Sequence, residues 1–300
     1  MRSEVDDVLA RHGGAATRSA LVARAGRAVV DHEVRRGELT AIFPRVYSRS
    51  WMADDPTIQQ IAAVRSCGAS SLLSHTTALA RFGLVGACPG QPIHITSNAP
   101  RHPRGVPGRL VVHRTRSALV RSLATGLPTT GLAEALMQAW PLLRGAEQRA
   151  PLIKASRQRM ILPAEIGAQL DVHPKLKGRA RLVELLRLLE GGCESELELW
   201  GYQAVFNRPE FRHARWQLPL RTRHGVFRID LGFEAEKLAV ELDGRAYHAG
   251  RDQWERDIRR DLELATLGWQ TVRLSHQRLT TDVPGCRRDI AAVLRSRRTG

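Results

Sequence analysis

The chain has 300 residues, of which 43% are hydrophobic and 25% charged, as is typical of globular proteins with one or two domains. No apolar run approaches the roughly 20 residues needed to cross a bilayer, and the acidic N-terminus does not resemble a signal peptide. The four scattered cysteines form no Cys-x-x-Cys pair, which argues against a cysteine zinc site and a disulfide framework. These features predict no membrane association and a location in the reducing cytoplasm.

The net charge of +16 is distributed unevenly along the chain. Residues 194–300 contain 19 Lys and Arg against 16 Asp and Glu, whereas residues 1–193 contain 27 against 14. A basic domain attracts polyanions, of which DNA and RNA are the commonest in a cell. The charge therefore favours nucleic-acid binding by the first two thirds of the chain, although an Arg-rich genome would produce part of the same excess.

Residues 1–52 are typical of a small winged-helix domain. A first helix ends at Gly13-Gly14, Thr17 is a candidate N-cap for a second, and a third is expected over residues 28–36. Two short strands at 39–43 and 44–47 would form the wing.

The third of these helices carries the candidate DNA-binding residues. They are expected to lie away from the apolar Val29, Val30 and Val34, and they are His32, Arg35 and Arg36. Exposed basic side chains on this helix suit contact with a DNA groove or phosphates. An ordinary solvated helix face would have the same composition, so the helix alone does not decide between the two.

Residues 53–135 are predicted to form a mixed α/β region. Helices are expected at about 58–67 and from residue 74, and strands at 92–96 and 110–113. His75, His94 and His113 invite a metal-site interpretation. None of them has a histidine or carboxylate partner at helical spacing, however, which favours separate structural roles.

Residues 136–190 are predicted to be helical, with breaks at Pro141, Pro151, Pro163 and Pro174. An apolar stripe in the last helix consists of Leu182, Leu185, Leu186 and Leu189. Gly191-Gly192 follows and marks the strongest predicted domain boundary, so a fourth domain is expected over residues 191–300.

The last hundred residues are predicted to fold in the order α-β-β-β-α-β, which makes the chain a mixed α/β protein. A helix begins near Ser195, and strands are expected at 216–220, 226–233 and 238–243. A helix over 253–267 and a strand at 269–274 complete the series. The apolar face expected for this helix consists of Trp254, Ile258, Leu262 and Ala265.

The central hairpin brings two carboxylates together. If its turn lies between Ala235 and Glu236, cross-strand residue numbers sum to 471, and Asp230 lies opposite Glu241. Facing carboxylates destabilise a sheet unless something neutralises them, and a divalent cation such as Mg²⁺ or Mn²⁺ would do so. The same register pairs Asp243 with Arg228, which gives Asp243 a structural explanation as an ion pair.

Several motifs of this region resemble one known family. They are Arg-Ile-Asp230, Val240-Glu241-Leu242-Asp243-Gly244-Arg245-Ala246-Tyr247-His248, Trp254-Glu255-Arg256-Asp257 and Leu267-Gly268-Trp269. Over about residues 193–280 they resemble the DUF559 family of the PD-(D/E)XK nuclease superfamily, which is similar to very-short-patch repair endonucleases. The resemblance implies Mg²⁺-dependent hydrolysis of phosphodiester bonds in duplex DNA.

The resemblance also implies roles for individual residues. Asp230 would be the central metal ligand, Glu241 a second carboxylate, and Glu198 an acidic helix residue bound to the metal or its water. Asp243 and His248 lie where the repair endonucleases have catalytic histidines, and only His248 keeps that residue type. The superfamily also has a Lys two residues after its Glu, where this chain has Asp243. Water activation would then depend on the metal, assisted by His248.

The N-terminal region has a resemblance of its own. The winged-helix pattern through Phe43-Pro44-Arg45-Val46-Tyr47, followed by Leu73-Ser74-His75-Thr76-Thr77-Ala78, is similar to AbiEi-type antitoxins of type IV toxin–antitoxin systems. That family implies DNA binding, repression of its own operon and a cognate toxin. Two hypotheses follow: a DNA-binding endonuclease, and a non-enzymatic antitoxin-like regulator with an inactive nuclease fold. The missing Lys favours the regulator, and the retained acidic residues favour the enzyme.

Overall fold

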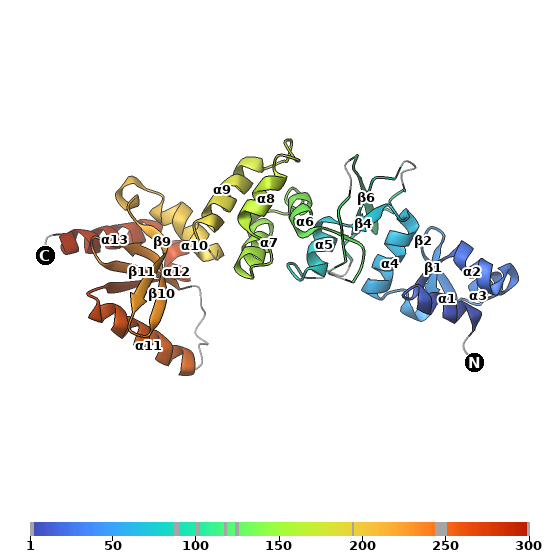
Figure 1. Cartoon of the computed structure of the whole chain (residues 1–300), viewed down its shortest axis with the longest axis horizontal. Coiled ribbons are helices and arrows are strands. Elements are labelled where there is room, and N and C mark those ends of the chain that lie inside the picture. Colours follow the sequence, from blue (N-terminus) through green and yellow to red (C-terminus); the bar gives the residue numbers. More distant parts are fainter. Residues whose placement is uncertain are drawn as a thin grey trace. The chain divides into compact units, whose positions relative to one another are not determined.

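The computed structural model describes residues 3–86, 90–99, 103–116, 119–123, 126–193, 195–243 and 251–298. It divides into two compact units, the first comprising Met1–Pro151 and Ala168–Gly178, the second Leu152–Gly167 and Arg179–Gly300 (Figure 1). The described residues form the mixed α and β fold that the sequence predicts, and their strands make three sheets. The four-domain division proposed from the sequence stays a prediction. Every helix in the described ranges is too short or too polar to cross a membrane.

The first unit begins with three helices and a three-stranded sheet. The elements are α1 (Glu4–Arg11), β1 (Ala15–Thr17), α2 (Arg18–Ala25), α3 (Arg27–Arg35), β2 (Leu39–Phe43) and β3 (Val46–Arg49). The sheet order is β1-β3-β2, with both pairs antiparallel. Thr17 caps α2 as predicted, because its hydroxyl accepts the N–H of Ala20. The expected helices and strands of this segment are therefore present.

Helix α3 presents a different face to the core from the one predicted. Of its three valines only Val30 is buried, while Val29 and Val34 are exposed. Glu33 takes an inward position instead, because the guanidinium of Arg49 pairs with its carboxylate at 2.8 Å. The three candidate DNA-binding residues of this helix region are exposed, as expected.

A five-stranded sheet follows, with order β6-β5-β4-β8-β7. Its strands and flanking helices are η1 (Ser50–Met52), α4 (Pro56–Cys67), β4 (Ser71–Leu73), α5 (His75–Arg81), β5 (Ile93–Ser97), β6 (Leu110–Arg114), β7 (Arg121–Ser122), β8 (Thr129–Thr130) and α6 (Leu132–Ala139). Strand β5 is parallel to β6 and antiparallel to β4. One core joins this region to the three-stranded sheet, since Phe43 and Val46 belong to the same buried cluster as Ile58 and Ile95.

Three helices separate the sheets of the first unit from the C-terminal sheet in the sequence: α7 (Gly145–Arg157), α8 (Pro163–Gln169) and α9 (Arg179–Glu190). The predicted break at Pro151 is wrong, because this proline lies inside α7. A proline costs the helix one backbone hydrogen bond, and the buried Leu152 and Ile153 that follow it stabilise the continued helix by packing. The leucine stripe of α9 is buried as predicted.

The C-terminal part of the second unit has the predicted α-β-β-β-α-β order. Its elements are α10 (Glu196–Trp200), η2 (Gly201–Phe206), η3 (Pro209–Phe211), β9 (Arg215–Thr222), β10 (Gly225–Phe233), β11 (Leu238–Asp243), α11 (Arg251–Thr266) and β12 (Gln270–Ser275), followed by α12 (His276–Thr281) and α13 (Val283–Arg298). The sheet order is β12-β11-β10-β9, and only the β11–β12 pair among these is parallel.

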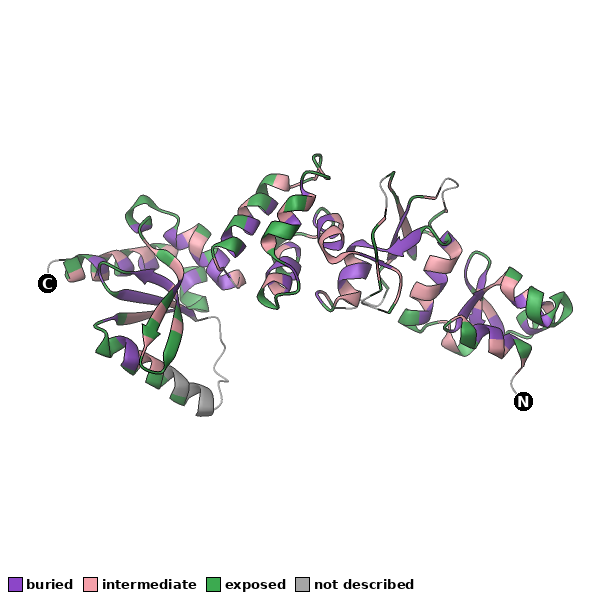
Figure 2. Ribbon diagram, viewed as in Figure 1, coloured by how far each residue is buried: buried purple, intermediate pink, exposed green. Residues whose placement is uncertain are grey.

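Helices cover both faces of this sheet (Figures 1 and 2). One core joins the sheet to α10, α12 and α13, and a smaller one joins it to α11 through Leu264. The predicted apolar face of α11 is wrong, because Ile258 and Leu262 are 44% and 64% exposed. The helix is turned so that Leu264 is buried against the sheet and Arg260 contacts Glu241.

Candidate functional site

The site begins at an interruption between strands β9 and β10. Leu218 pairs with Ile229 and Trp216 pairs with Leu231, but the residues between them are outside the ladder. The two strands also change faces there: Leu218 and Ile229 belong to the core under α11, and Trp216 and Leu231 to the core under α13. A regular strand would place residues two apart on the same face. The skipped residues are Gln217 and Asp230.

Gln217 adopts a backbone conformation that is rare for a residue with a side chain, with φ of +49°. Such strain costs about 1–3 kcal/mol and is concentrated at functional sites. Gly192 packs directly against it, because a Cβ on Gly192 would lie 3.0 Å from the Cβ of Gln217. The glycine pair predicted to mark a boundary therefore also has a packing role beside the site.

Asp230 is fixed by two hydrogen bonds. Its Oδ2 accepts the backbone N–H of Leu242 at 2.9 Å, and its Oδ1 accepts Nε2 of Gln217 at 3.3 Å. The first bond connects β10 to β11 just beyond the end of their ladder, whose last pair is Leu231 with Val240. Asp230 therefore has a structural partner on each neighbouring strand.

Glu198 reaches the same point from α10. Ser195 caps that helix by accepting the N–H of Glu198 at 3.1 Å, and its hydroxyl lies 2.7 Å from Oε1 of the same residue. Oε2 of Glu198 then accepts Nε2 of Gln217 at 2.9 Å. One amide nitrogen thus joins the carboxylates of Glu198, which is buried, and Asp230, which is half-buried.

Glu241 lies on β11 in the predicted register, because the described partners of β10 and β11 sum to 471. Its Oε1 accepts Nη2 of Arg260 at 2.6 Å, and the same nitrogen donates to the carbonyl of Arg228 at 2.6 Å. Arg260 therefore holds the Glu241 side chain from α11. Nε of Arg260 is buried and has no hydrogen-bond partner among the described residues.

Burial dominates the electrostatics of these carboxylates. It raises the pKa of Glu241 to about 7, and the positive charge of Arg260 offsets this effect only in part, while Asp230 adds to it. Burial also raises the pKa of Asp230, against the opposing effects of the Leu242 hydrogen bond and of Arg260. A site that raises the pKa of two neighbouring carboxyls favours protonation or a bound cation.

The other site residues predicted from the sequence lie outside this group of carboxylates or outside the described residues. The backbone of Asp243 pairs with Ser275 of β12, while its side chain, and therefore the proposed ion pair with Arg228, is outside the described residues. His248 also lies outside them. His32, Arg35 and Arg36 belong to the first unit.

Two site residues, Gln217 and Arg260, were not predicted from the sequence. Gln217 occupies a strand position where regular alternation gives it no special role, and only the interruption directs it toward the carboxylates. Arg260 is one of several arginines on α11, and the apolar residues of that helix indicated the wrong face. One indication of a residue such as Arg260 was available from the hairpin, because a glutamate buried at position 241 needs a cationic partner.

The carboxylates fit a divalent cation by their chemistry. Glu198, Asp230 and Glu241 offer oxygen donors, which Mg²⁺ and Mn²⁺ prefer. The amide of Gln217 now occupies the space between two of these donors, so an ion bound there requires this side chain to withdraw.

A family model supports the fold of this region. Residues 204–294 match the model of a restriction-endonuclease-like family, REase_MTES_1575. Asp230 and Glu241 lie within the match, and Glu198 lies just before it. The chain is also similar to the crystal structure of the RV2827C protein from Mycobacterium tuberculosis, with 20% identity and a TM-score of 0.40 over 61% of this chain and 75% of that one. No curated protein matches the chain.

The mixed α and β fold of the C-terminal region is therefore consistent with a restriction-endonuclease-like domain. Folds of this type commonly use divalent metal ions.

Proposed function

We propose that the chain is a DNA-binding protein whose second unit hydrolyses phosphodiester bonds with the help of Mg²⁺ or Mn²⁺. One observation carries the proposal: Glu198, Asp230 and Glu241, from three different elements, converge on Gln217 and Arg260 within a restriction-endonuclease-like domain. The proposal keeps the resemblance to the DUF559 nucleases and places the protein in the cytoplasm.

In this proposal Glu198, Asp230 and Glu241 hold the cation. When bound, the cation supplies charge neutralisation at the phosphate that is attacked. Asp230 keeps its place through the N–H of Leu242, so it is presented in a fixed position. Arg260 is a positioning residue, since it orients the carboxylate of Glu241.

Arg260 also provides a positive charge where the Lys of the superfamily pattern is missing. The nuclease superfamily pattern has a cation two residues after Glu241, and this chain has Asp243 at that position. Arg260 provides a positive charge to the same carboxylate from α11 instead. A guanidinium is a cation that stabilises negative charge and does not serve as a base. Asp243 and His248 remain the proposed residues for proton handling.

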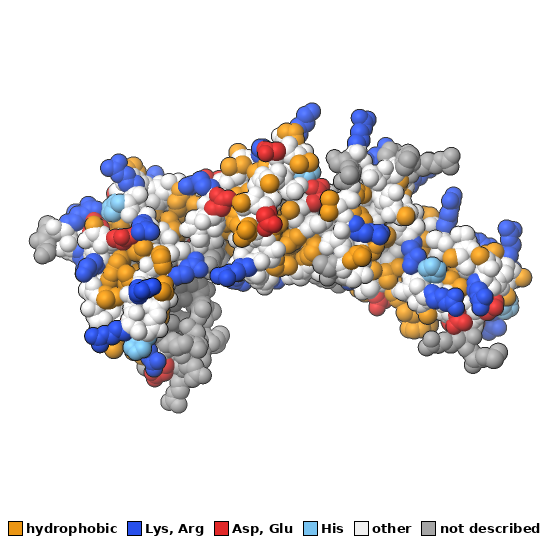
Figure 3. All heavy atoms as spheres, in the orientation of Figure 1, with side chains coloured by type: hydrophobic (Ala, Val, Ile, Leu, Met, Phe, Trp, Pro, Cys, Tyr) orange, Lys and Arg blue, Asp and Glu red, His pale blue; other side chains and the backbone are white. Residues whose placement is uncertain are grey.

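The first unit is proposed to bind duplex DNA through a winged helix. The helix and strand order of residues 4–49 fits that fold, and α3 exposes His32 and Arg35, with Arg36 at its end. Exposed Arg side chains also occur on the N-terminal part of the unit (Figure 3). Val29 and Val34 are exposed on the same helix and offer apolar contact to base methyl groups.

A second candidate is a regulator similar to the AbiEi antitoxins, with a cognate toxin as partner and an inactive nuclease fold. Two observations favour it: the pattern's Lys is absent, and Gln217 joins the two carboxylates that would hold the ion.

A cleavage assay separates the two functions. The full chain is incubated with supercoiled, linear and mismatched duplex DNA in Mg²⁺, Mn²⁺ or EDTA. The variant is Asp230→Asn, which keeps an oxygen acceptor for the Leu242 N–H, and the control is Glu234→Gln, an exposed carboxylate in the hairpin turn. The nuclease proposal expects metal-dependent cleavage by wild type and control, reduced by about a hundredfold or more in Asp230→Asn. DNA binding without cleavage in any cation supports the regulator.

A further inference from the structure

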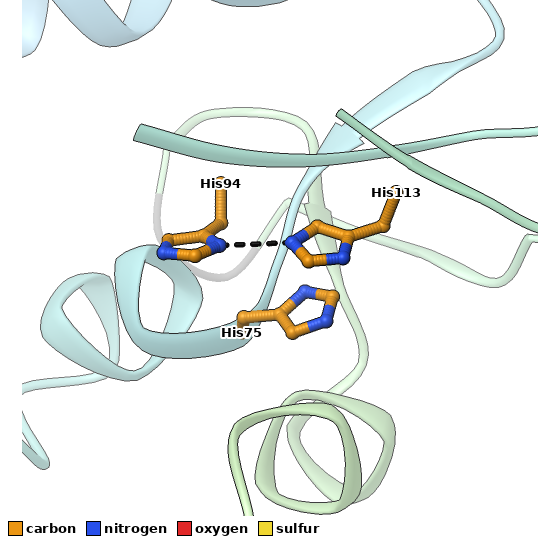
Figure 4. A group of neighbouring side chains, drawn as sticks. All are labelled: His75, His94 and His113. Carbon is orange, nitrogen blue, oxygen red and sulfur yellow. Dashed lines mark hydrogen bonds between the residues drawn. The ribbon is translucent and has the colours of Figure 1, made fainter. Parts of the chain in front are cut away.

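Three histidines that are far apart in the sequence meet in the first unit (Figure 4). His75 is the first residue of α5, His94 lies in β5 and His113 in β6. One ring nitrogen from each lies within 4.8 Å of the other two. The prediction that they are isolated is therefore wrong, because adjacent strands bring together residues that no local spacing connects.

The backbone around the cluster fixes where each ring begins. Thr96 is the register partner of His113 across the parallel strands β5 and β6, and His94 lies two residues before Thr96 on the same face. The N–H of Ser74 donates to the carbonyl of His94, and the N–H of His94 donates to Oγ1 of Thr77. These bonds attach the start of α5 to β5 beside the two strand histidines.

His75 carries a strained backbone, with φ of +52° at the N-terminus of α5. A residue with a side chain seldom adopts this conformation, and persistence of such strain points to a functional constraint. The ring is also oriented, because Nδ1 lies 2.9 Å from the hydroxyl of the fully buried Ser74. With Nδ1 engaged in this way, Nε2 is the nitrogen that His75 can offer to a ligand. An outer hydrogen bond on the second ring nitrogen is the usual support of a metal-ligating histidine.

An unpaired polar group lies beside the cluster. Thr96 is only 2% exposed, and its hydroxyl has no hydrogen-bond partner among the described residues. A buried hydroxyl without a partner costs roughly 1–3 kcal/mol, so it calls for a partner such as an ordered water or anion. Its position opposite His113 places it on the sheet face that carries the two strand histidines.

The rings are close to the separation that one ion requires. His94 Nδ1 and His113 Nε2 are 2.9 Å apart, and the ring of His75 is stacked on that of His113 with centroids 3.6 Å apart. Two nitrogens bound to one tetrahedral zinc ion lie about 3.4 Å apart. Binding one ion would therefore require the rings to rotate out of the stack, so that one nitrogen of each points at the metal.

We propose that His75, His94 and His113 bind one zinc ion, leaving a fourth position for water or an anionic group near Thr96. Three nitrogen donors without a carboxylate suit zinc and similar transition metals, whereas Mg²⁺ and Ca²⁺ require oxygen ligands. Burial, together with the neighbouring rings, lowers the pKa of His75 to about 2 and of His94 to about 4, so both are neutral, as ligands must be. This site is separate from the carboxylates of the second unit, and it does not depend on nuclease activity.

Cobalt substitution tests the proposal on the full chain. After treatment with EDTA and removal of the chelator, the protein is titrated with Co²⁺, and the visible absorption of a tetrahedral site is recorded before and after addition of Zn²⁺. Oxygen-coordinated Co²⁺ at the carboxylates is octahedral and absorbs weakly, so the two sites are distinguished. Bound zinc per chain and the melting temperature with and without zinc are measured in parallel.

The variants are His94→Gln and His113→Gln, and the control is His276→Gln, an exposed histidine of α12. The proposal expects one zinc ion per chain and a zinc-dependent rise in melting temperature for wild type and control. Each variant should lose the tetrahedral absorption and weaken zinc binding by about a hundredfold or more. Circular dichroism without metal verifies that the variants are folded. If either variant is unfolded, the Co²⁺ titration is repeated with Asp230→Asn, which shows whether the absorption signal depends on the carboxylates of the second unit. A wild type that binds no zinc, or whose binding survives both His variants, would overturn the proposal and leave a stack of neutral histidines.

Discussion

Replacing Glu241 with Gln should make the metal-free protein less sensitive to alkaline pH. The carboxyl has a pKa of about 7 in the folded chain against 4.5 as its ordinary value. The folded state therefore binds this proton more tightly than the unfolded state does. The resulting stability is complete below about pH 4.5 and is lost as the pH rises through 7. A pKa difference of about 2.5 corresponds to about 3 kcal/mol, most of it lost between pH 5 and pH 8.5.

Urea unfolding in EDTA at pH 5, 7 and 8.5 measures this effect. Wild type and Glu241→Gln share every other titratable group, so the difference between their unfolding free energies isolates Glu241. We expect the difference to shift in favour of the variant by about 2.5 kcal/mol between pH 5 and pH 8.5. Glu234→Gln is the matched control, since this exposed carboxylate should change stability by less than about 1 kcal/mol at any pH. A difference that does not depend on pH, or that shifts in the opposite direction, would refute the assignment of a buried carboxyl that favours its proton.

Two glycine and two arginine substitutions test packing and ion pairing. Gly232→Ala should destabilise the second unit by about 1–3 kcal/mol in thermal melts, because the new Cβ would lie 2.4 Å from a methyl group of the buried Leu218. Gly167→Ala in α8 should stabilise the protein by about 0.5–1 kcal/mol in the same melts, because its new Cβ would meet no atom within 4 Å. Arg49→Met should cost about 3 kcal/mol, because it leaves a buried carboxylate of α3 without its cation. Arg36→Met, which removes an exposed pair, should cost less than about 1 kcal/mol, and equal losses for the two arginines by urea unfolding would contradict this reasoning.

The features that follow from local pattern could be predicted from the sequence. The hairpin register was predictable because a short turn and alternating apolar residues leave few alternatives, and it correctly placed Glu241 on β11. The Ser-x-x-Glu spacing of Ser195 and Glu198 is typical of a helix start, and the two side chains are in contact in the structure. That spacing gives no indication that Glu198 also contacts Gln217, which joins it to Asp230.

Features that depend on contacts between distant segments could not be predicted in this way. The face of α11 was misjudged because its larger apolar residues, Ile258 and Leu262, are exposed, and the contact with Glu241 turns Arg260 inward. The meeting of His94 and His113 depends on the parallel pairing of β5 and β6, which leaves no periodic trace in the sequence. The skipped pair at Asp230 likewise arises only when two strands are aligned.

The unequal cores on the two faces of the C-terminal sheet have a dynamic consequence. Among the side chains that the structure describes, α11 belongs to a small cluster around Leu264 and Trp269, whereas α13 belongs to a much larger one. Elements with few buried contacts open by local fluctuation at a lower free energy than the rest of the domain. Each such opening of α11 would carry Arg260 away from Glu241 and admit solvent to the carboxylate. Transient detachment of one helix would therefore control access to this side of the site, while the strands that carry Asp230 and Glu241 stay in place.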